Sequence, residues 1–372
     1  MIRVLHVIGV MDRAGAETFI MNVYRNIDRS KIQFDFLVHT EKEGDYDKEI
    51  RQLGGKIYSL PRYTVLNYPI YKKKCDDFFS EHPEYRIVHG HIGSCAPIYL
   101  QIAKEHGCFA IAHSHSCMCQ GRGLYSFVFS VMAKPVAHIA DHFLACSDDA
   151  GIDRFGPRII KQENYQTIKN GIELDRFAFS LEKRRETRRQ LGIDDNAPVF
   201  IHVGRFNPVK NHSFLLETFE KILGILPNSL LLLIGKGELE RDIRKQIERL
   251  NITENVLLLG SQSDVSPYLS AADVFIFPSI SEGLSISTIE AQTSGLPCVV
   301  SSGVPDEALV LPHVSKLGLE LGPDEWAKEC VAQFQERRIT LRPDSALNMK
   351  QYEYDIADTA RELQRLYESH PA

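Results

Sequence analysis

The stretch PSISEGLSISTIEAQTSGLP at residues 278–297 decides the fold class of this chain. It follows the apolar run Val274–Phe277, crosses a Ser- and Gly-rich loop, enters a helical pattern, and closes with Gly-Leu-Pro before the apolar run Cys298–Val300. This order of strand, loop, helix and strand is typical of a βαβ unit. Free backbone N–H groups at the start of the helix, together with the helix dipole, favour a bound phosphate or sugar hydroxyl groups there.

Two carboxylates mark the same stretch. Glu282 lies in the loop, and Glu290 lies eight residues further along, in the helix. At a rise of about 1.5 Å per residue, the two positions are roughly 12 Å apart. This spacing lets the carboxylates hold two parts of one extended ligand, such as a sugar and a ribose. The competing interpretation is a capped helix that carries a surface glutamate.

The alternation of short apolar runs and amphipathic helical patterns extends over the whole chain. Strands this apolar on both faces are typical of parallel sheets that are covered by helices. Besides the two runs named above, the expected strands are Arg3–Ile8, Gln33–Val38, Lys56–Ser59, Ile87–His89, Phe109–His113, His142–Cys146, Val199–Val203, Leu230–Ile234 and Val256–Leu259. The expected helices include Glu17–Ile27, Ala96–Lys104, Tyr125–Ala137, Leu181–Leu191, Ser213–Leu226, Glu238–Leu250 and Asp355–Tyr367. We therefore predict an α/β protein of two doubly wound domains.

Length and composition agree with this prediction. The 372 residues suit two domains of roughly 150–200 residues each. Hydrophobic residues make up 44% and charged residues 25%, which excludes disordered and fibrous chains. The net charge of −6 argues against a dedicated nucleic-acid binder, and it is uneven, at +1 for residues 1–178 and −7 for residues 179–372.

The sequence also bears on the compartment. There is no run of about 18 apolar residues, so we expect no transmembrane helix. The eight cysteines are widely spread, unlike the disulfide framework of a small secreted protein. We therefore expect a reduced, cytoplasmic protein.

A second motif, VGRFNPVKNH at residues 203–212, joins a strand end to a helix entry. Arg205 and Lys210 flank its turn, where two cations can clamp a diphosphate and neutralise the charge of a leaving group. The alternative is two solvated cations near a helix start. No Gly-x4-Gly-Lys-Ser/Thr phosphate loop occurs.

The first strand is followed by the loop GVMDRAGAE at residues 9–17. The loop has too few glycines for a dinucleotide-binding fingerprint, which weakens an NAD or FAD interpretation. Gly15 and Ala16 offer backbone N–H groups to a ligand. Glu17 is either a further ligand or an acid in the first turn of a helix.

Histidines follow two expected strands. His113 and His115 lie where the strand Phe109–His113 ends, the usual place for a ligand-facing residue in an open α/β sheet. His89 and His91 flank the end of the strand Ile87–His89 and are weaker candidates for a ligand contact, with a core or surface role as the alternative for each. The His-x-His-x-Cys-x-Cys pattern at residues 113–119 would place four candidate ligands on one strand face, whereas zinc ligands usually come from different turns or elements. We therefore expect no metal.

With these motifs in view, the chain resembles the retaining glycosyltransferases of family 4, or glycosyltransferase group 1, which have the GT-B fold. Residues 282–290 match the E-x7-E signature of that family. The resemblance implies that Glu290 binds the ribose of a nucleotide-sugar, and that Glu282 lies near the donor sugar as a catalytic residue. The loop amides expected to contact the donor are those of Gly283, Leu284 and Ser285. Ser285 stands where Gly or Pro is usual, which leaves the donor sugar open.

The other two glycine-containing motifs also resemble elements of the family. Residues 204–211 match its G-R-x4-K-N element, so Arg205 and Lys210 are the expected diphosphate ligands. The loop before Glu17 resembles the family's G-G-A-E loop with Ala14 in place of the first glycine. Its backbone at residues 15–16 is then expected to bind the donor.

The resemblance assigns the catalytic histidine to His113, which would orient the sugar and stabilise charge at the anomeric centre. His115 is the rival assignment, and His91 and His115 are weak candidates for the acceptor side of the site. The family retains anomeric configuration, and a front-face route, in which the leaving diphosphate helps to accept the acceptor's proton, fits the absence of an evident nucleophile. No metal or other cofactor is expected for this reaction.

The GT-B resemblance also implies a domain plan. Residues 1–178 would be the acceptor-binding Rossmann-like domain and residues 179–350 the nucleotide-sugar-binding one, on either side of a cleft. Residues 351–372 would form a helix that returns to the first domain. The base, uracil or another, would lie against the backbone of Gly260–Asp264.

Within the family, the chain looks most like bacterial exopolysaccharide and capsule enzymes. We therefore expect transfer of a hexose-type sugar, from a UDP-sugar in our interpretation, to a growing lipid-linked repeat unit. A basic cluster at residues 71–74 and an apolar helical run at residues 124–132 would suit peripheral contact with the inner face of the cytoplasmic membrane. The alternatives are a soluble small-molecule acceptor, or a protein that binds a nucleotide-sugar without catalysis.

Overall fold

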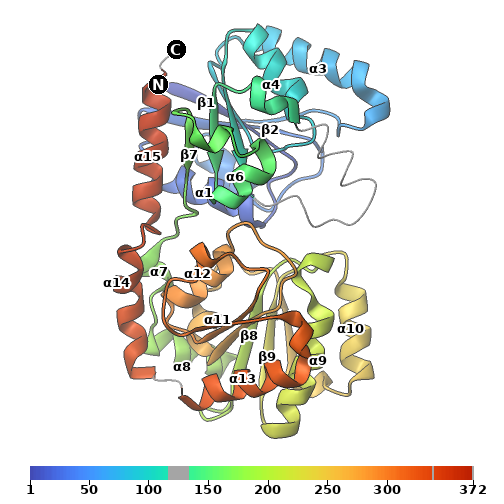
Figure 1. Cartoon of the computed structure of the whole chain (residues 1–372), viewed down its shortest axis with the longest axis vertical. Coiled ribbons are helices and arrows are strands. Elements are labelled where there is room, and N and C mark those ends of the chain that lie inside the picture. The colour runs from blue at the N-terminus through green and yellow to red at the C-terminus, as the bar shows by residue number, and fades with distance from the viewer. Residues whose placement is uncertain (116–133, 337–338, 371–372) are drawn as a thin grey trace. The chain divides into compact units, whose positions relative to one another are not determined.

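The computed structural model describes residues 1–115, 134–336 and 339–370 of the chain (Figure 1). It divides into two compact units, Met1–Gly171 with Ile356–Ala372, and Ile172–Asp355. The chain therefore leaves the first unit at residue 171 and returns to it at residue 356, where a helix begins.

The first unit is built on a seven-stranded sheet whose order is β3-β2-β1-β4-β5-β6-β7. Every neighbouring pair is parallel, and most strand residues are buried, as the apolar runs of the sequence predict. The chain order reverses between β1 and β4, which makes this pair the switch point of the sheet. The strands are β1 (Ile2–Ile8), β2 (Ile32–Val38), β3 (Ile57–Ser59), β4 (Ile87–Gly90), β5 (Phe109–Ser114), β6 (His142–Ala145) and β7 (Tyr165–Thr167).

The helices of the first unit are α1 (Gly15–Asn26), α2 (Asp47–Gln52), α3 (Tyr68–Glu81), α4 (Ala96–Glu105), α6 (Asp148–Phe155) and α15 (Ile356–Glu368), with 3-10 turns at Val65–Asn67, Lys134–His138 and Ile159–Lys161. The last helix, α15, packs against α1 and β1 although it is far from both in sequence (Figure 1). Its buried face includes Ile356, Ala360, Leu363 and Tyr367. This spacing of apolar residues over three turns explains why the terminal helix docks.

The second unit contains a six-stranded parallel sheet in the order β10-β9-β8-β11-β12-β13, with its switch point between β8 and β11. Its strands are β8 (Val199–Val203), β9 (Leu230–Ile234), β10 (Val256–Gly260), β11 (Val274–Phe277), β12 (Cys298–Ser301) and β13 (Val314–Leu317). Its helices are α7 (Leu174–Phe177), α8 (Leu181–Gln190), α9 (His212–Ile225), α10 (Glu240–Arg249), α11 (Ser266–Ala271), α12 (Ile286–Thr293), α13 (Gly322–Glu336) and α14 (Ser345–Lys350). Short 3-10 turns lie at Pro208–Lys210, Thr253–Asn255, Asp306–Ala308, Leu319–Leu321 and Ile339–Asp344.

These two parallel sheets confirm the predicted α/β class with two Rossmann-like domains. The strands that the sequence did not reveal are β7 and β13, each the last strand of its sheet. Both are only half-buried and contain polar residues, so they lack the continuous apolar run of a central strand. Most of the expected helix Tyr125–Ala137 lies outside the described residues. Within the parts of the chain that the structure describes, none of the helices combines the length and the hydropathy that a membrane span requires.

The most charged expected helix, α8, turns out to be part of the packed core. Two of its arginines, Arg184 and Arg188, are buried and each donates to one carboxylate oxygen of Asp273 at 2.8 Å. Asp273 also accepts a hydrogen bond from the backbone N–H of Val199 at 2.9 Å, at the start of β8. This cluster therefore ties the helix that enters the second unit to the two central strands of its sheet.

We predict that Asp273→Asn lowers the free energy of unfolding by about 3–5 kcal/mol, because two buried guanidinium groups lose their counter-charge. Chemical denaturation followed by circular dichroism measures this change. Glu186→Gln removes the exposed Arg189 pair on the same helix and should leave the midpoint unchanged. Equal effects of the two substitutions would contradict the structural role of Asp273.

Candidate active site

In the second unit, the loop after β8 places Lys210. The N–H of Phe206 donates to the carbonyl of Lys236 at 3.0 Å, and a Cβ atom on Gly237 would lie 2.3 Å from the carbonyl oxygen of Phe206. A glycine is therefore required at residue 237 for the two loops to pack. The side-chain oxygen of Asn207 accepts from the N–H of Lys210 at 3.1 Å and caps the 3-10 turn that carries this lysine.

Lys210 and Glu282 form an ion pair. Their Nζ and Oε1 atoms are 2.7 Å apart, and the two side chains are only 17% and 12% exposed. The hydroxyl of Ser279 also donates to Glu282. The ammonium group lies 4.6 Å from the centre of the Phe277 ring at the end of β11. Two residues that the sequence assigned separately to the diphosphate and to the sugar therefore meet, because β8 and β11 are neighbours at the switch point.

The loop that carries Glu282 is held from both sides. The N–H of Glu282 donates to the carbonyl of Gly303 at 2.9 Å, and the N–H of Ile280 donates to the carbonyl of Val209 at 2.8 Å. A Cβ atom on Gly303 would lie 2.3 Å from the carbonyl oxygen of Ile280. These contacts fix the position of the carboxylate before any ligand binds.

The start of α12 offers backbone donors. The side chain of Ser285 caps the helix by accepting from the N–H of Thr288 at 3.3 Å, which gives a structural reason for serine at this position. The amides of Gly283 and Ser285 donate no hydrogen bond to any of the described residues. Leu284 between them is buried. This end of the helix can therefore donate to a negatively charged or hydroxyl-bearing ligand.

Glu290 is buried within α12, at 7% exposure. Its carboxyl group forms no hydrogen bond with a described residue, and burial raises its pKa to about 8. The charge of Arg176 lowers this pKa and the charge of Asp264 raises it, so Glu290 lies near the Gly260–Asp264 segment that was expected to meet the base. A buried carboxyl group without a protein partner is suited to bind hydroxyl groups of a ligand.

Arg205 differs from Lys210. It lies on the same loop after β8, but its side chain is exposed and has no ion-pair or hydrogen-bond partner among the residues described. Of the two cations predicted for the diphosphate, one is therefore held in place by Glu282 and the other is free to move onto a ligand.

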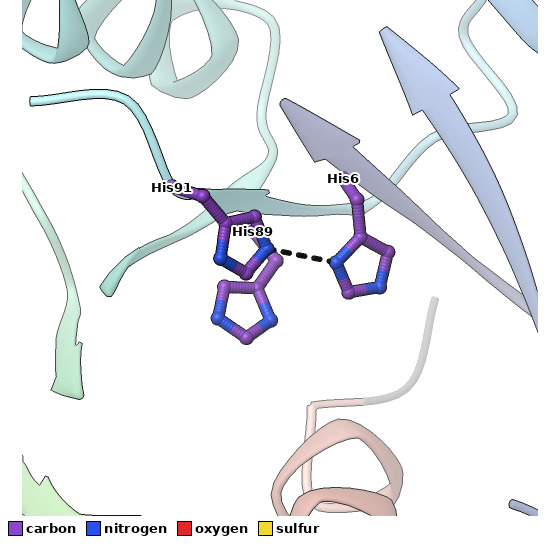
Figure 2. Close-up of side chains that lie close together, drawn as sticks. All are labelled: His6, His89 and His91. Atoms are coloured by element: carbon purple, nitrogen blue, oxygen red, sulfur yellow. Dashed lines mark hydrogen bonds between the residues drawn. The ribbon is translucent and has the colours of Figure 1, made fainter. Parts of the chain in front are cut away.

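In the first unit, five histidines gather at the carboxyl edge of the sheet, around its switch point. They come from three adjacent strands: His6 lies on β1, opposite His89 on β4, and His113 lies on β5. His91 and His115 each follow two residues later. Figure 2 shows His6, His89 and His91, with the rings of His6 and His91 turned toward one another.

Hydrogen bonds order these rings into two chains. In one chain, His89 Nδ1 is 2.7 Å from the Tyr367 hydroxyl of α15, and His89 Nε2 is 3.1 Å from His113 Nδ1. In the other, His91 Nε2 is 3.0 Å from His6 Nδ1, and His91 Nδ1 is 2.7 Å from His115 Nε2. Because a neutral imidazole carries one N–H, each bond sets the tautomer of the next ring.

The cluster is uncharged at neutral pH. Burial lowers the pKa of His6 and of His115 to about 3. The neighbouring His115 ring lowers the pKa of His6 further, and the charge of Arg154 lowers the pKa of His115. Burial together with the neighbouring histidines lowers the pKa values of His89, His91 and His113 well below 6.5. At pH 7 these rings therefore offer neutral N–H groups and lone pairs.

The structure brings the four histidines named from the sequence, His89, His91, His113 and His115, into one cluster. His113 is buried, and its ring lies edge-on to Phe19 of α1, with 5.4 Å between centroids. His115 is half-buried and packs on His113. The choice of His113 as the catalytic residue stays a prediction. Gly15 and Ala16 form the first turn of α1, where the helix has no side-chain cap.

Two members of this site were missed by the sequence analysis. His6 lies in the middle of an apolar strand, and only the sheet order places it beside His89. Tyr367 is nearly 280 residues away from His89 in sequence. Cys117, Cys119 and the apolar run at residues 124–132, which the sequence analysis had considered, lie outside the described residues.

The raised pKa of Glu290 predicts a pH effect on stability. The folded protein binds a proton at Glu290 between pH 4.5 and about 8 that the unfolded chain does not bind. The stabilisation by this group is therefore complete below pH 4.5 and is lost as pH rises toward 8, at about 1.4 kcal/mol per pH unit. Glu290→Gln should lack this loss, so its stability relative to the wild type should increase from pH 5 to pH 8.

Denaturant unfolding of both proteins at several pH values measures this difference. All other titrating groups are shared and cancel. Glu254→Gln, at an exposed position, should show no such trend. A constant difference between Glu290→Gln and the wild type from pH 5 to pH 8 would show that Glu290 is charged in the folded protein.

Comparison with known proteins agrees with this arrangement. Residues 183–316 match the family model described as glycosyl transferases group 1. EpsF of Bacillus subtilis, which is named as a glycosyltransferase, is 32% identical over 330 residues, covering 88% of this chain and 86% of its own. CapH of Staphylococcus aureus, named as a capsular polysaccharide biosynthesis glycosyltransferase, is 25% identical over 385 residues, covering 99% of each chain.

Among solved structures, Anabaena HepE in complex with UDP and glucose has a TM-score of 0.81 to this chain. The two are 17% identical, and the match covers 99% of this chain and 100% of HepE. This likeness concerns the fold, in which two parallel sheets follow one another as they do here. The extended match to EpsF shows the family: the chain belongs to the group 1 glycosyltransferases and has their GT-B fold.

Proposed function

We propose that this glycosyltransferase moves a hexose from a UDP-sugar, with retention of anomeric configuration, to a hydroxyl group of a growing lipid-linked saccharide. The observation that carries the donor half of the proposal is the fixed Lys210–Glu282 pair beside the helix start of α12. Cations, backbone donors and carboxylates together suit a molecule with a diphosphate between two hydroxyl-rich rings.

Each part of the nucleotide-sugar, namely diphosphate, sugar, ribose and base, has a proposed partner in this site. Arg205 and Lys210 would bind the diphosphate, and the free Arg205 side chain would close on it. Glu282 and the amides of residues 283–285 would contact the sugar. Glu290 would accept hydrogen bonds from the ribose hydroxyls, and the base would lie along Gly260–Asp264. The choice of uracil is supported by the fold likeness to HepE, which was solved with UDP.

The catalytic assignment to His113 has physical support. Its Nε2 atom is buried and has no hydrogen-bond partner, so it is available to a substrate group. The ring stays neutral at pH 7, because burial lowers its pKa, so it can exchange hydrogen bonds without carrying charge. The chain Tyr367–His89–His113 couples the tautomers of the two rings and orients the His113 ring. We place Gly15 and Ala16 on the phosphate side of the same substrate.

The lipid-linked acceptor is supported by an exposed apolar surface on the first unit. The segment before and within α3 presents Val65, Leu66 and Ile70 at 56%, 96% and 61% exposure. Residues 72–74, all lysines, follow directly and are also exposed. Apolar side chains beside lysines are the combination that binds an anionic membrane surface.

Donor hydrolysis tests the proposed activity. Purified protein is incubated with a panel of UDP- and GDP-sugars, and we expect it to hydrolyse one UDP-hexose slowly to UDP and the free sugar. Arg205→Ala and Glu290→Ala should each reduce kcat/KM at least 100-fold, because the first removes a cation from the diphosphate and the second removes the hydrogen-bond acceptor for the ribose hydroxyls. Arg241→Ala on α10 changes an exposed arginine outside the site and serves as the matched control.

Wild-type turnover by both site variants would refute the donor assignment. Tight UDP binding without hydrolysis of any donor to its nucleoside diphosphate would favour the alternative of a nucleotide-sugar-binding protein without catalysis. Thermal melts of every variant separate loss of activity from loss of fold.

Vesicle binding tests the acceptor side. The protein should co-sediment with vesicles that contain anionic lipid, and Leu66→Ser with Ile70→Ser should weaken binding about tenfold or more, through lost burial of two large side chains. Ile225→Ser changes an apolar residue of the second unit that is 50% exposed and serves as the control. Transfer to a soluble saccharide, with no vesicle binding, would favour a soluble acceptor instead.

A further inference from the structure

The histidine cluster holds more ring nitrogens than its own hydrogen bonds use. His6 Nε2, His113 Nε2 and His115 Nδ1 are buried and have no hydrogen-bond partner. Ligand nitrogens of His91, His113 and His115 all lie within 4.8 Å of one another. We propose that His91, His113 and His115 form a binding site for one zinc-class transition-metal ion.

The chemistry of the cluster selects the class of metal. All of its members are neutral imidazoles, and neutral imidazole nitrogen is the form that binds Zn²⁺, Co²⁺, Ni²⁺ and Cu²⁺. No carboxylate belongs to either metal-sized group found among the described residues. Mg²⁺ and Ca²⁺, which prefer oxygen ligands, therefore do not fit. Three imidazoles leave a fourth coordination position open.

A second grouping, His6 with His89 and His91, is equally compact (Figure 2). His91 belongs to both groupings, and its two ring nitrogens already have partners, His6 and His115, so a metal in either grouping replaces one hydrogen bond of His91. The second grouping is less suitable, because both ring nitrogens of His89 have partners as well, Tyr367 and His113. A metal at His89 would have to break one of these bonds. His113 and His115, in contrast, each keep one nitrogen without a partner.

The remaining cluster members then take the place of supporting residues. A metal on Nδ1 of His91 replaces the 2.7 Å hydrogen bond to His115 Nε2, while its Nε2–H donates to His6 Nδ1, at 3.0 Å. With a metal on Nε2 of His113, its Nδ1–H donates to His89 Nε2, at 3.1 Å, and His89 donates on to Tyr367. Such hydrogen bonds to the far nitrogen of a ligand fix ring orientation and raise its basicity.

Arg154 of α6 is the cation whose charge acts on His115. Its Nε and Nη1 atoms are buried without a hydrogen-bond partner. Its charge disfavours a bare cation nearby, and it favours an anion in the open fourth position. We therefore expect the ion to bind with hydroxide or phosphate as its fourth ligand.

This inference departs from the expectation of no metal, which considered His-x-His-x-Cys-x-Cys along one strand. Here the ligands come from two neighbouring strand ends, as is usual for zinc ligands, and not from one strand face. The proposed transfer needs the free Nε2 of His113, so an ion bound there should inhibit transfer. That consequence rests on the proposed function, whereas metal binding itself does not.

Direct titration tests the site without any substrate. The full chain, freed of metal with a chelator, is titrated with Zn²⁺ by calorimetry and with Co²⁺ by visible absorption. We expect about one ion per chain with the spectrum of four-coordinate Co²⁺. His113→Gln and His115→Gln should abolish binding, and His6→Gln should weaken it about 10- to 100-fold. His138→Gln, at an exposed position, is the control.

Thiolates also bind zinc, so Cys117→Ser with Cys119→Ser is titrated in parallel and should keep the ion. Circular dichroism checks that each variant is folded. Loss of metal binding in His6→Gln, with binding retained in His115→Gln, would overturn this ligand assignment and favour the second grouping, His6 with His89 and His91. An absence of stoichiometric Zn²⁺ or Co²⁺ binding by the folded wild type would overturn the site.

Discussion

The candidate sites of both units depend on one constraint, the parallel direction of every strand in each sheet. Parallel strands bring their carboxyl ends to one edge, and the reversal of strand order opens that edge at a single place. In the second unit the reversal lies between β8 and β11, and the loops that follow these strands carry Lys210 and Glu282. In the first unit it lies between β1 and β4, which carry His6 and His89. Polar and titratable side chains therefore gather at the switch point of each sheet.

Most of this arrangement could be predicted from the sequence. Central strands such as β9 and β11 are continuous apolar runs bounded by polar turns, so periodicity and length identify them. The loop at residues 278–285 could be recognised because its glutamate, its small residues and the following helix occur in a fixed order. For the same reason, the GT-B class and the family were predicted correctly. The edge strands β7 and β13 were not, because half-buried strands of three or four residues resemble loops.

Pairings across long sequence separations could not be predicted. The Lys210–Glu282 pair joins residues 72 positions apart, and His89 meets Tyr367 across 278 positions. Lys210 and Glu282 were each expected to contact a ligand, and Tyr367 was not expected in the site at all, since an isolated sequence position says nothing about which neighbour the fold supplies. The buried arginines of α8 make the same point, because its sequence is dense in charge and yet Arg184 and Arg188 pair with Asp273 in the core. Charge in a sequence indicates exposure only when no buried partner exists.

The same reasoning resolves the uneven charge of the two parts of the chain. The part with net charge −7 carries the proposed site for an anionic donor, which total charge alone would argue against. The charges that act most strongly on a ligand are those within a Debye length of about 8 Å. For the proposed donor site we expect these to be the charge of Arg205, the charge of Lys210, which is paired with Glu282, and the partial positive charge at the start of α12. Glu290 adds no negative charge at neutral pH while burial keeps its pKa near 8. Local burial and pairing, and not the sum of charges, therefore decide what this acidic part can bind.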